Sequence, residues 1–254
     1  GMYIGIAIPV AVIILQVWHI LMVPVRKLQS PVYRDFDVKM IRIFLHGTLR
    51  GYLAIVLPLS FMLFLAYGHL TDFLCGPVVT RSEAVAFSLC GFMPLGLVMT
   101  NMLFEVMRNL RKPKTQLIFL MIGFVAGLGV LILLKQVLHA EAQMFPLSFL
   151  VPALVYFIFV FFELKKQLRF GFVYLGLAVE QLLLVVAPGL LVYILDRYGL
   201  NGLSAGAALA MVCGIYALVY LIAMMIVPVV SDSDLDSLPG AAGFLTLRHL
   251  FFRG

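Results

Sequence analysis

Five polar side chains interrupt long apolar stretches of this sequence, and their types could hold a solute or a counter-ion: Gln16, Arg50, Asn101, Glu105 and Glu180. A guanidinium can bind phosphate or carboxylate through two hydrogen bonds, while a carboxylate can take up a proton or a cation. Because a charged side chain at the centre of a bilayer costs on the order of 2.5–3.5 kcal/mol, such residues are candidate functional groups wherever their segments span a membrane.

The charged residues of this set differ in their sequence neighbours. Glu105 precedes Arg108 by three residues on one helical face, which predicts a local ion pair. Glu180 has no such neighbour and adjoins Gln181, so it is the stronger candidate for an inward-facing group that takes a proton or a monovalent cation. Two interpretations of Arg50 stay open. Its side chain either reaches back to the headgroups or faces a polar cavity.

The elements that position these residues follow from composition. Of the 254 residues, 63% are apolar and 12% are charged, whereas soluble domains have about 45–50% and about 25%. A spanning helix needs roughly 20 apolar residues. The sequence therefore predicts an all-α, polytopic membrane bundle of about seven helices within residues 1–229, followed by a cytoplasmic tail at 230–254. The predicted spans are 2–25, 41–67, 84–107, 116–138, 145–162, 170–195 and 202–229.

The loops alternate in their content of lysine and arginine, which predicts the orientation of the chain. One side has fourteen such residues: Arg26, Lys27, Arg34, Lys39, Arg42, Arg108, Arg111, Lys112, Lys114, Lys165, Lys166, Arg169, Arg248 and Arg253. The other side has three: Arg81, Lys135 and Arg197. We therefore expect the C-terminus in the cytoplasm and the N-terminus outside. The net charge of +6 then needs no nucleic-acid partner, because basic loops are the ordinary signal of membrane topology.

Patterns typical of enzymes and metal sites are missing from the sequence. The three cysteines, Cys75, Cys90 and Cys213, are scattered and lack metal-ligand spacing. An acidic cluster, Asp232, Asp234 and Asp236, alternates with serine in the tail and is typical of a solvated linker. Residues 242–252 could form a short amphipathic helix on the membrane surface. We expect no metal, no cofactor and no enzymatic activity.

Proline and small residues punctuate the predicted spans. Five prolines, Pro9, Pro58, Pro94, Pro152 and Pro188, can each kink a helix, which favours a protein that moves. A stripe at four-residue spacing, Gly202, Gly206, Ala210 and Gly214, predicts close helix packing, either within the bundle or in a dimer. Gly123 and Gly127 predict a similar close approach in the fourth span.

Three stretches carry a resemblance to a known family. They are IGIAIP at 4–9, LAIVLPLSFMLFLAYGHLTDFL at 53–74 and PLGLVMTNMLFEVMRNLRKPKT at 94–115. Their order resembles the C-terminal half of the multidrug, oligosaccharidyl-lipid and polysaccharide flippase superfamily, which includes the lipid II flippase and the O-antigen translocases. The resemblance departs from the family pattern at Glu105, where a basic residue is commoner.

The resemblance implies a function and partners. The chain would be one lobe of a transporter that moves a lipid-linked oligosaccharide or polysaccharide precursor across the bacterial cytoplasmic membrane by alternating access. Arg50 would hold a phosphate, and Glu180 would respond to protons or to a cation. The partners would be membrane lipid, the lipid-linked glycan, and a missing N-terminal lobe or a second subunit. The alternatives are a multidrug exporter of the same fold and a non-catalytic subunit of a polysaccharide export complex.

Overall fold

The computed structural model describes residues 8–20, 22, 38–76, 86, 88–137, 141–168, 173–199 and 202–227. These residues are almost entirely helical, and none of them forms a strand. Six helical segments are long and apolar enough to cross a membrane, and a shorter apolar helix covers Ile8–Ile20. The predicted all-α, multi-pass membrane fold is confirmed.

Six helices overlap the predicted spans: α2 (Val38–Cys75), α4 (Met93–Asn109), α5 (Pro113–Gln136), α6 (Glu141–Leu168), α7 (Val173–Gly199) and α8 (Ala205–Ile226). Helix α2 extends eight residues beyond its predicted span, and α4 begins nine residues after the start of its own. The first predicted span, 2–25, is described only over Ile8–Ile20 and at residue 22. The predicted tail, with Asp232, Asp234, Asp236 and the segment 242–252, lies outside the described residues.

The longest helix is α2, with 38 residues. At 1.5 Å per residue it is about 57 Å long, well beyond the roughly 30 Å of a bilayer core. The basic, amphipathic stretch that begins at Val38 is the first part of this same helix. Ile41 and Leu45 are buried there while Lys39 is exposed, so the first three turns already have one face against the bundle.

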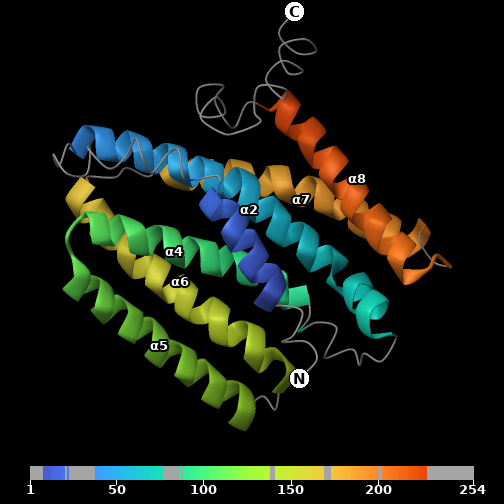
Figure 1. Ribbon diagram of the computed structural model, residues 1–254, viewed down its shortest axis with the longest axis horizontal. Helices are drawn as coiled ribbons and strands as arrows, with labels where there is room; N and C mark the ends of the chain where they lie inside the picture. Colours follow the sequence, from blue (N-terminus) through green and yellow to red (C-terminus); the bar gives the residue numbers. More distant parts are fainter. Residues whose placement is uncertain are drawn as a thin grey trace, which may run out of the picture.

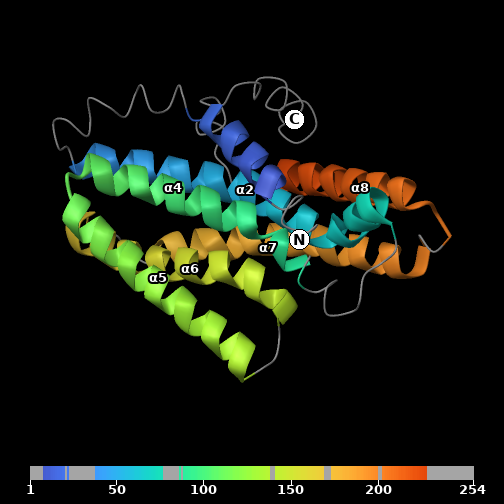
Figure 2. The same cartoon turned by 60° about the horizontal axis from the view of Figure 1, so that its bottom comes forward.

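Two groups of helices pack on different faces of α2, one of two helices and one of three. In one group, α7 and α8 contact α2 and each other; in the other, α5 and α6 pack together with α4, which contacts α2. Figure 1 places α4, α6 and α5 in succession on one side of α2, with α8 on its other side, and Figure 2 gives the same arrangement from a second direction. Each group has its own cluster of buried apolar side chains, and Leu53 of α2 packs at the edge of both clusters.

Basic residues gather at one end of the bundle. The turn between α4 and α5 contains Arg111 and Lys112, and Lys112 Nζ forms a 2.8 Å ion pair with Glu163 Oε1 near the end of α6. Ile41, near the start of α2, packs in the same cluster as Met107 and Leu110 at the end of α4. This arrangement agrees with the alternating loop charges, whose side of the membrane stays a prediction.

Two glycines of α5 allow a close contact with α6, as predicted. A Cβ atom at Gly123 would lie 2.9 Å from the Pro152 carbonyl oxygen, and one at Gly127 would lie 2.7 Å from Pro152 Cγ. Pro152 lies inside α6, as predicted for a proline that interrupts a span. Pro152 therefore packs directly against the two glycines of α5.

A break interrupts the membrane segment 88–109 before α4 begins. Gly91 and Phe92 form a turn, closed by hydrogen bonds from their amides to the carbonyl oxygens of Ser88 and Leu89. Pro94 was expected inside a helix, but it occupies the first turn of α4, where a missing amide proton costs nothing. At the break Gly91 lies against the backbone of α2, because a Cβ there would be 2.6 Å from Phe64 Cα.

The predicted small-residue stripe near α8 packs differently from expectation. Gly202 precedes the helix, and Ala210 and Gly214 are exposed. Only Gly206 closely meets another helix, since a Cβ there would lie 3.0 Å from the Phe73 ring. The packed face of α8 is instead formed by larger residues at the same spacing: Ala208, Val212, Tyr216 and Tyr220. Among the described residues Gly206 therefore packs within the bundle, and close packing of the rest of the stripe, in the bundle or in a dimer, stays a prediction.

Candidate functional site

Helices α2 and α7 run in the same direction, and two contacts between them show which of their turns lie at the same height. The Phe61 ring of α2 fills the space beside Gly189 of α7. Eight residues further along α2, His69 Nε2 lies 2.8 Å from Asp196 Oδ1, seven residues further along α7. Counting back eight residues from Phe61 and Gly189 brings Leu53 to the level of Gln181. This register fixes which polar residues share a layer.

Tyrosines of α8 close this three-helix group with hydrogen bonds to the backbone of its neighbours. Tyr220 donates from its hydroxyl to the Ala54 carbonyl oxygen of α2 at 2.7 Å. Tyr216 donates to the Val185 carbonyl oxygen of α7 at 3.5 Å. The two rings are parallel, with centroids 6.3 Å apart. The phenol groups thus bring hydrogen-bonding atoms into the interior of an otherwise apolar group.

Gln181 lies in the interior of the same group. Its side chain is completely buried, and it precedes Val185 and Val192 by four and eleven residues, so it shares their packed face. Neither its amide oxygen nor its amide nitrogen has a hydrogen-bond partner among the described residues. An unpaired buried amide costs about 1–3 kcal/mol. Gln181 therefore offers one donor group and one acceptor to a ligand that reaches this layer.

Arg50 lies one helical turn before this layer on α2. It precedes Leu57 and Phe61 by seven and eleven residues, and both of these pack in the cluster with α7 and α8. The arginine is partly buried, and its Nε atom is fully buried. By the α2–α7 register it lies three residues, or about 4.5 Å along the axis, from the level of Gln181.

Glu180 lies beside Gln181 in the sequence but on the outer surface of α7. Its side chain is exposed, whereas Gln181 is completely buried. Within the described part of the chain, Glu180 has no ion-pair or hydrogen-bond partner. The interior position that sequence analysis assigned to the glutamate is thus occupied by its neighbour, and a role of Glu180 in an ion pathway stays a prediction.

Asn101 and Glu105 lie on α4. Helix α4 packs on the face of α2 that contains Tyr52, whose hydroxyl donates to the Leu95 carbonyl oxygen at 2.7 Å. Asn101 and Glu105 are partly buried, and Asn101 Oδ1 is buried without a hydrogen-bond partner among the described residues. Arg108 is exposed and forms no ion pair in the described part of the chain, so the predicted Glu105–Arg108 pair does not form.

Gln16 is exposed on the short helix Ile8–Ile20. That helix contacts the bundle through another residue, Trp18, whose ring meets Tyr52 edge-on with centroids 5.9 Å apart. The α2–α7 register therefore places Arg50 about one helical turn from the level of Gln181. Gln16 and Glu180 are exposed, and Asn101 and Glu105 belong to α4. No group of histidine, cysteine and carboxylate side chains within the described ranges could hold a metal ion.

The sequence shows that Gln181 is polar, but the charge of the adjacent Glu180 favours the glutamate as the predicted site residue. Around residue 180, apolar side chains occupy all sides of α7, so no amphipathic pattern identifies the buried face. Comparison with protein-family models, curated proteins and solved structures finds no match to this chain. The polar layer of Arg50, Gln181 and Tyr220 is thus the basis on which function can be argued.

Proposed function

We propose that this chain is a lobe of a membrane transporter, and that it moves a lipid-linked oligosaccharide or polysaccharide precursor across the bacterial cytoplasmic membrane by alternating access. The observation that carries the proposal is the unpaired, fully buried amide of Gln181, one turn from Arg50 within a group of membrane helices. Buried polar groups are nearly always paired in folded proteins, so an unpaired one needs an explanation. A ligand that pairs with it is the explanation we favour.

The chemistry of this layer suits the headgroup of such a substrate. A guanidinium matches the geometry of a phosphate group and keeps its charge in a membrane interior. An amide both donates to phosphate or carbonyl oxygens and accepts from sugar hydroxyls. Arg50 would bind the phosphate that links lipid to glycan, and Gln181 would bind the adjoining sugar or phosphate oxygen. The lipid tail would stay in the bilayer, and no covalent step is required.

The exposed position of Glu180 supports the assignment as a lobe. An exposed carboxylate in contact with lipid would cost on the order of 2.5–3.5 kcal/mol. We infer that this face of α7 meets a polar cavity or another protein surface in the working transporter, either a second lobe or a second subunit. There Glu180 could take up the proton or monovalent cation that couples to transport.

Prolines within helices support a moving protein. Pro58 interrupts α2 and Pro188 interrupts α7, and both helices border the polar layer. Each proline removes one backbone hydrogen bond, which lowers the cost of bending the helix at that turn. Transporters of many folds use such turns to open and close a central site.

The test is a glycan-export complementation assay with the full-length protein carrying Arg50→Ala or Gln181→Leu. We expect each variant to reduce export about ten-fold or more, because each removes a headgroup contact. Arg197→Ala is the control, since it removes an exposed arginine near the far end of α7. Membrane levels of all variants must match the parent protein.

Normal export by both variants at normal membrane levels would overturn the assignment of the site. Unchanged glycan export combined with altered drug accumulation would instead favour the small-molecule exporter of the same fold.

A further inference from the structure

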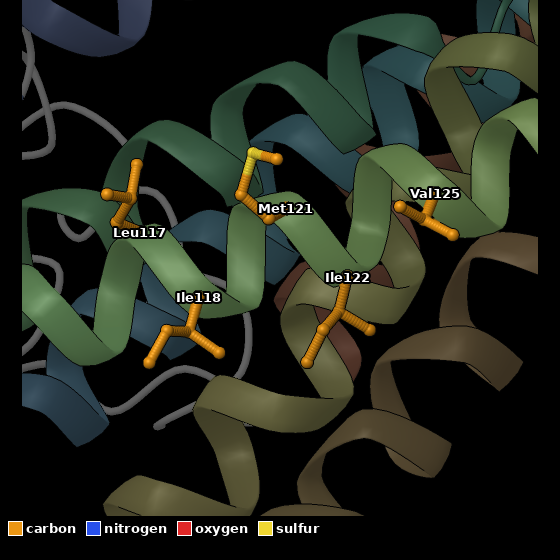
Figure 3. Close-up of a pocket in the computed structure, with 5 residues that line it drawn as sticks. All are labelled: Leu117, Ile118, Met121, Ile122 and Val125. Carbon is orange, nitrogen blue, oxygen red and sulfur yellow. The ribbon is translucent and has the colours of Figure 1, made fainter.

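A shallow groove of about 390 Å³ runs along the outer face of α5. Five apolar side chains line it: Leu117, Ile118, Met121, Ile122 and Val125. In Figure 3, Leu117, Met121 and Val125 form one row along the helix, and Ile118 and Ile122 form a second. All five are exposed on the described bundle, with between 37% and 63% of each residue accessible. The groove therefore opens to whatever surrounds α5.

Lys114 lies on the same side of α5 as the groove residues, near the N-terminal end of the helix. Lys114 precedes Leu117 and Ile118 by three and four residues, and Met121 and Val125 by seven and eleven. These spacings place all of them on one side of an α-helix. From Lys114 to Val125 the stripe is about 16.5 Å long, which matches one leaflet, or half of a roughly 30 Å hydrocarbon core.

Two further cations precede this end of the groove in the sequence. Arg108 and Arg111 are exposed, like Lys114, and none of the three forms an ion pair with a described residue. Lys112 differs from them, because it is held by Glu163 at 2.8 Å. The end of α4, the turn and the start of α5 thus present three positive charges, and Glu163 is already paired with Lys112.

The backbone of this turn is fixed by a Schellman motif. The Lys112 amide donates to the Met107 carbonyl oxygen at 3.2 Å, and the Arg111 amide donates to the Arg108 carbonyl oxygen at 3.0 Å. Arg111 occupies the left-handed position of the motif with φ of 56°, where glycine is usual. A non-glycine residue there costs on the order of 1 kcal/mol. Arg111 therefore occupies a position where the backbone conformation alone would favour glycine.

We infer that this groove and turn bind an anionic phospholipid of the cytoplasmic leaflet. Its phosphate would lie against Lys114 and Arg111, and one acyl chain would follow the groove from Leu117 to Val125. Three features favour a lipid over a protein helix: the lining is entirely apolar, the charge lies at one end only, and the length is that of one leaflet. This inference is independent of the transport proposal, which concerns the group of α2, α7 and α8.

Native mass spectrometry of the purified chain, with equal amounts of phosphatidylglycerol and phosphatidylcholine, tests the inference. We expect the parent protein to retain phosphatidylglycerol in preference. The double variant Arg111→Gln and Lys114→Gln should reduce that retention about five-fold or more, because it removes the two charges that face the phosphate. Met121→Trp should reduce it similarly, because the larger ring occupies the groove.

Two control variants distinguish a specific lipid-binding site from general contact with lipid. Lys135→Gln removes an exposed cation at the other end of α5, and Ile132→Trp adds a ring on the same stripe beyond the groove. Both should leave retention unchanged. Equal retention of the two lipids, or full retention by the double variant, would overturn the inference. Disulfide crosslinking between two copies through Val125→Cys would overturn it as well, since the groove would then be a protein interface.

Discussion

His69 of α2 and Asp196 of α7 are joined by a 2.8 Å hydrogen bond, although 127 residues separate them in the sequence. Both side chains are partly exposed, at 24% and 31%, near the end of the bundle opposite the basic turn. Because Phe61 and Gly189 meet two turns away, this bond fixes the register of two helices that run in parallel. The same register places Gln181 beside the turn that contains Arg50.

The two side chains should be energetically coupled. In a double-mutant cycle with His69→Ala and Asp196→Ala, we expect a coupling free energy of about 0.5–1.5 kcal/mol, as for a partly exposed, charge-assisted pair. Thermal unfolding in detergent measures it. Lys135→Ala, combined with either variant, is the control and should give purely additive changes.

Gly91 should tolerate no side chain. Gly91→Ala places a methyl group 2.6 Å from Phe64 Cα, so the break before α4 has to move away from α2. We expect a loss of about 1–3 kcal/mol in the free energy of unfolding. The matched control is Gly214→Ala, where no atom lies within 4 Å and the helix should gain about 0.5–1 kcal/mol. Equal stability of the two variants would contradict the close approach of the helices.

Replacing Gln181 should raise the stability of the protein while it lowers export activity. Gln181→Leu removes two unpaired buried atoms and keeps most of the volume, so the protein should become more stable by about 1–3 kcal/mol. Gln116→Leu is the contrast, because Gln116 is also buried but donates to the Phe104 carbonyl oxygen at 3.4 Å. That change should bring a smaller gain or a loss. Thermal melts of both proteins in one detergent decide the comparison.

The direction of insertion can be tested on α5 alone. With the native cysteines replaced by serine, Lys114→Cys should react with a membrane-impermeant maleimide only after the cytoplasmic side is opened. Lys135→Cys should react in intact cells. The opposite pattern would reverse the orientation that the loop charges predict.

Sequence patterns predicted the helices well and the pairing of side chains poorly. Apolar length and loop charge depend on the bilayer, which acts on each helix separately, so the spans and their alternation could be predicted. Gly123 and Gly127 also met another helix as predicted, because small residues allow close contact whatever the partner.

Which face of a helix lies inside could not be predicted for α7 or α8. Their surfaces are apolar on all sides, since lipid and protein interior both accept leucine and valine. The choice between Glu180 and Gln181, and between Gly214 and Tyr216 as the packed residue, therefore depended on tertiary packing. The hydrogen bond between His69 and Asp196 could not be predicted either, because no local sequence pattern links residues in two separate helices.

The length of α2 has a mechanical consequence. One helix of 38 residues contacts both the α7–α8 pair and the group of α4, α5 and α6. Pro58 interrupts it between the turn that meets Leu95 and the turn that meets Asp196. If the two helix groups rotate relative to each other, α2 has to twist or bend, and it does so most easily at the turn that Pro58 interrupts. Stiffening α2 with Pro58→Ala would then slow any relative motion of the two groups.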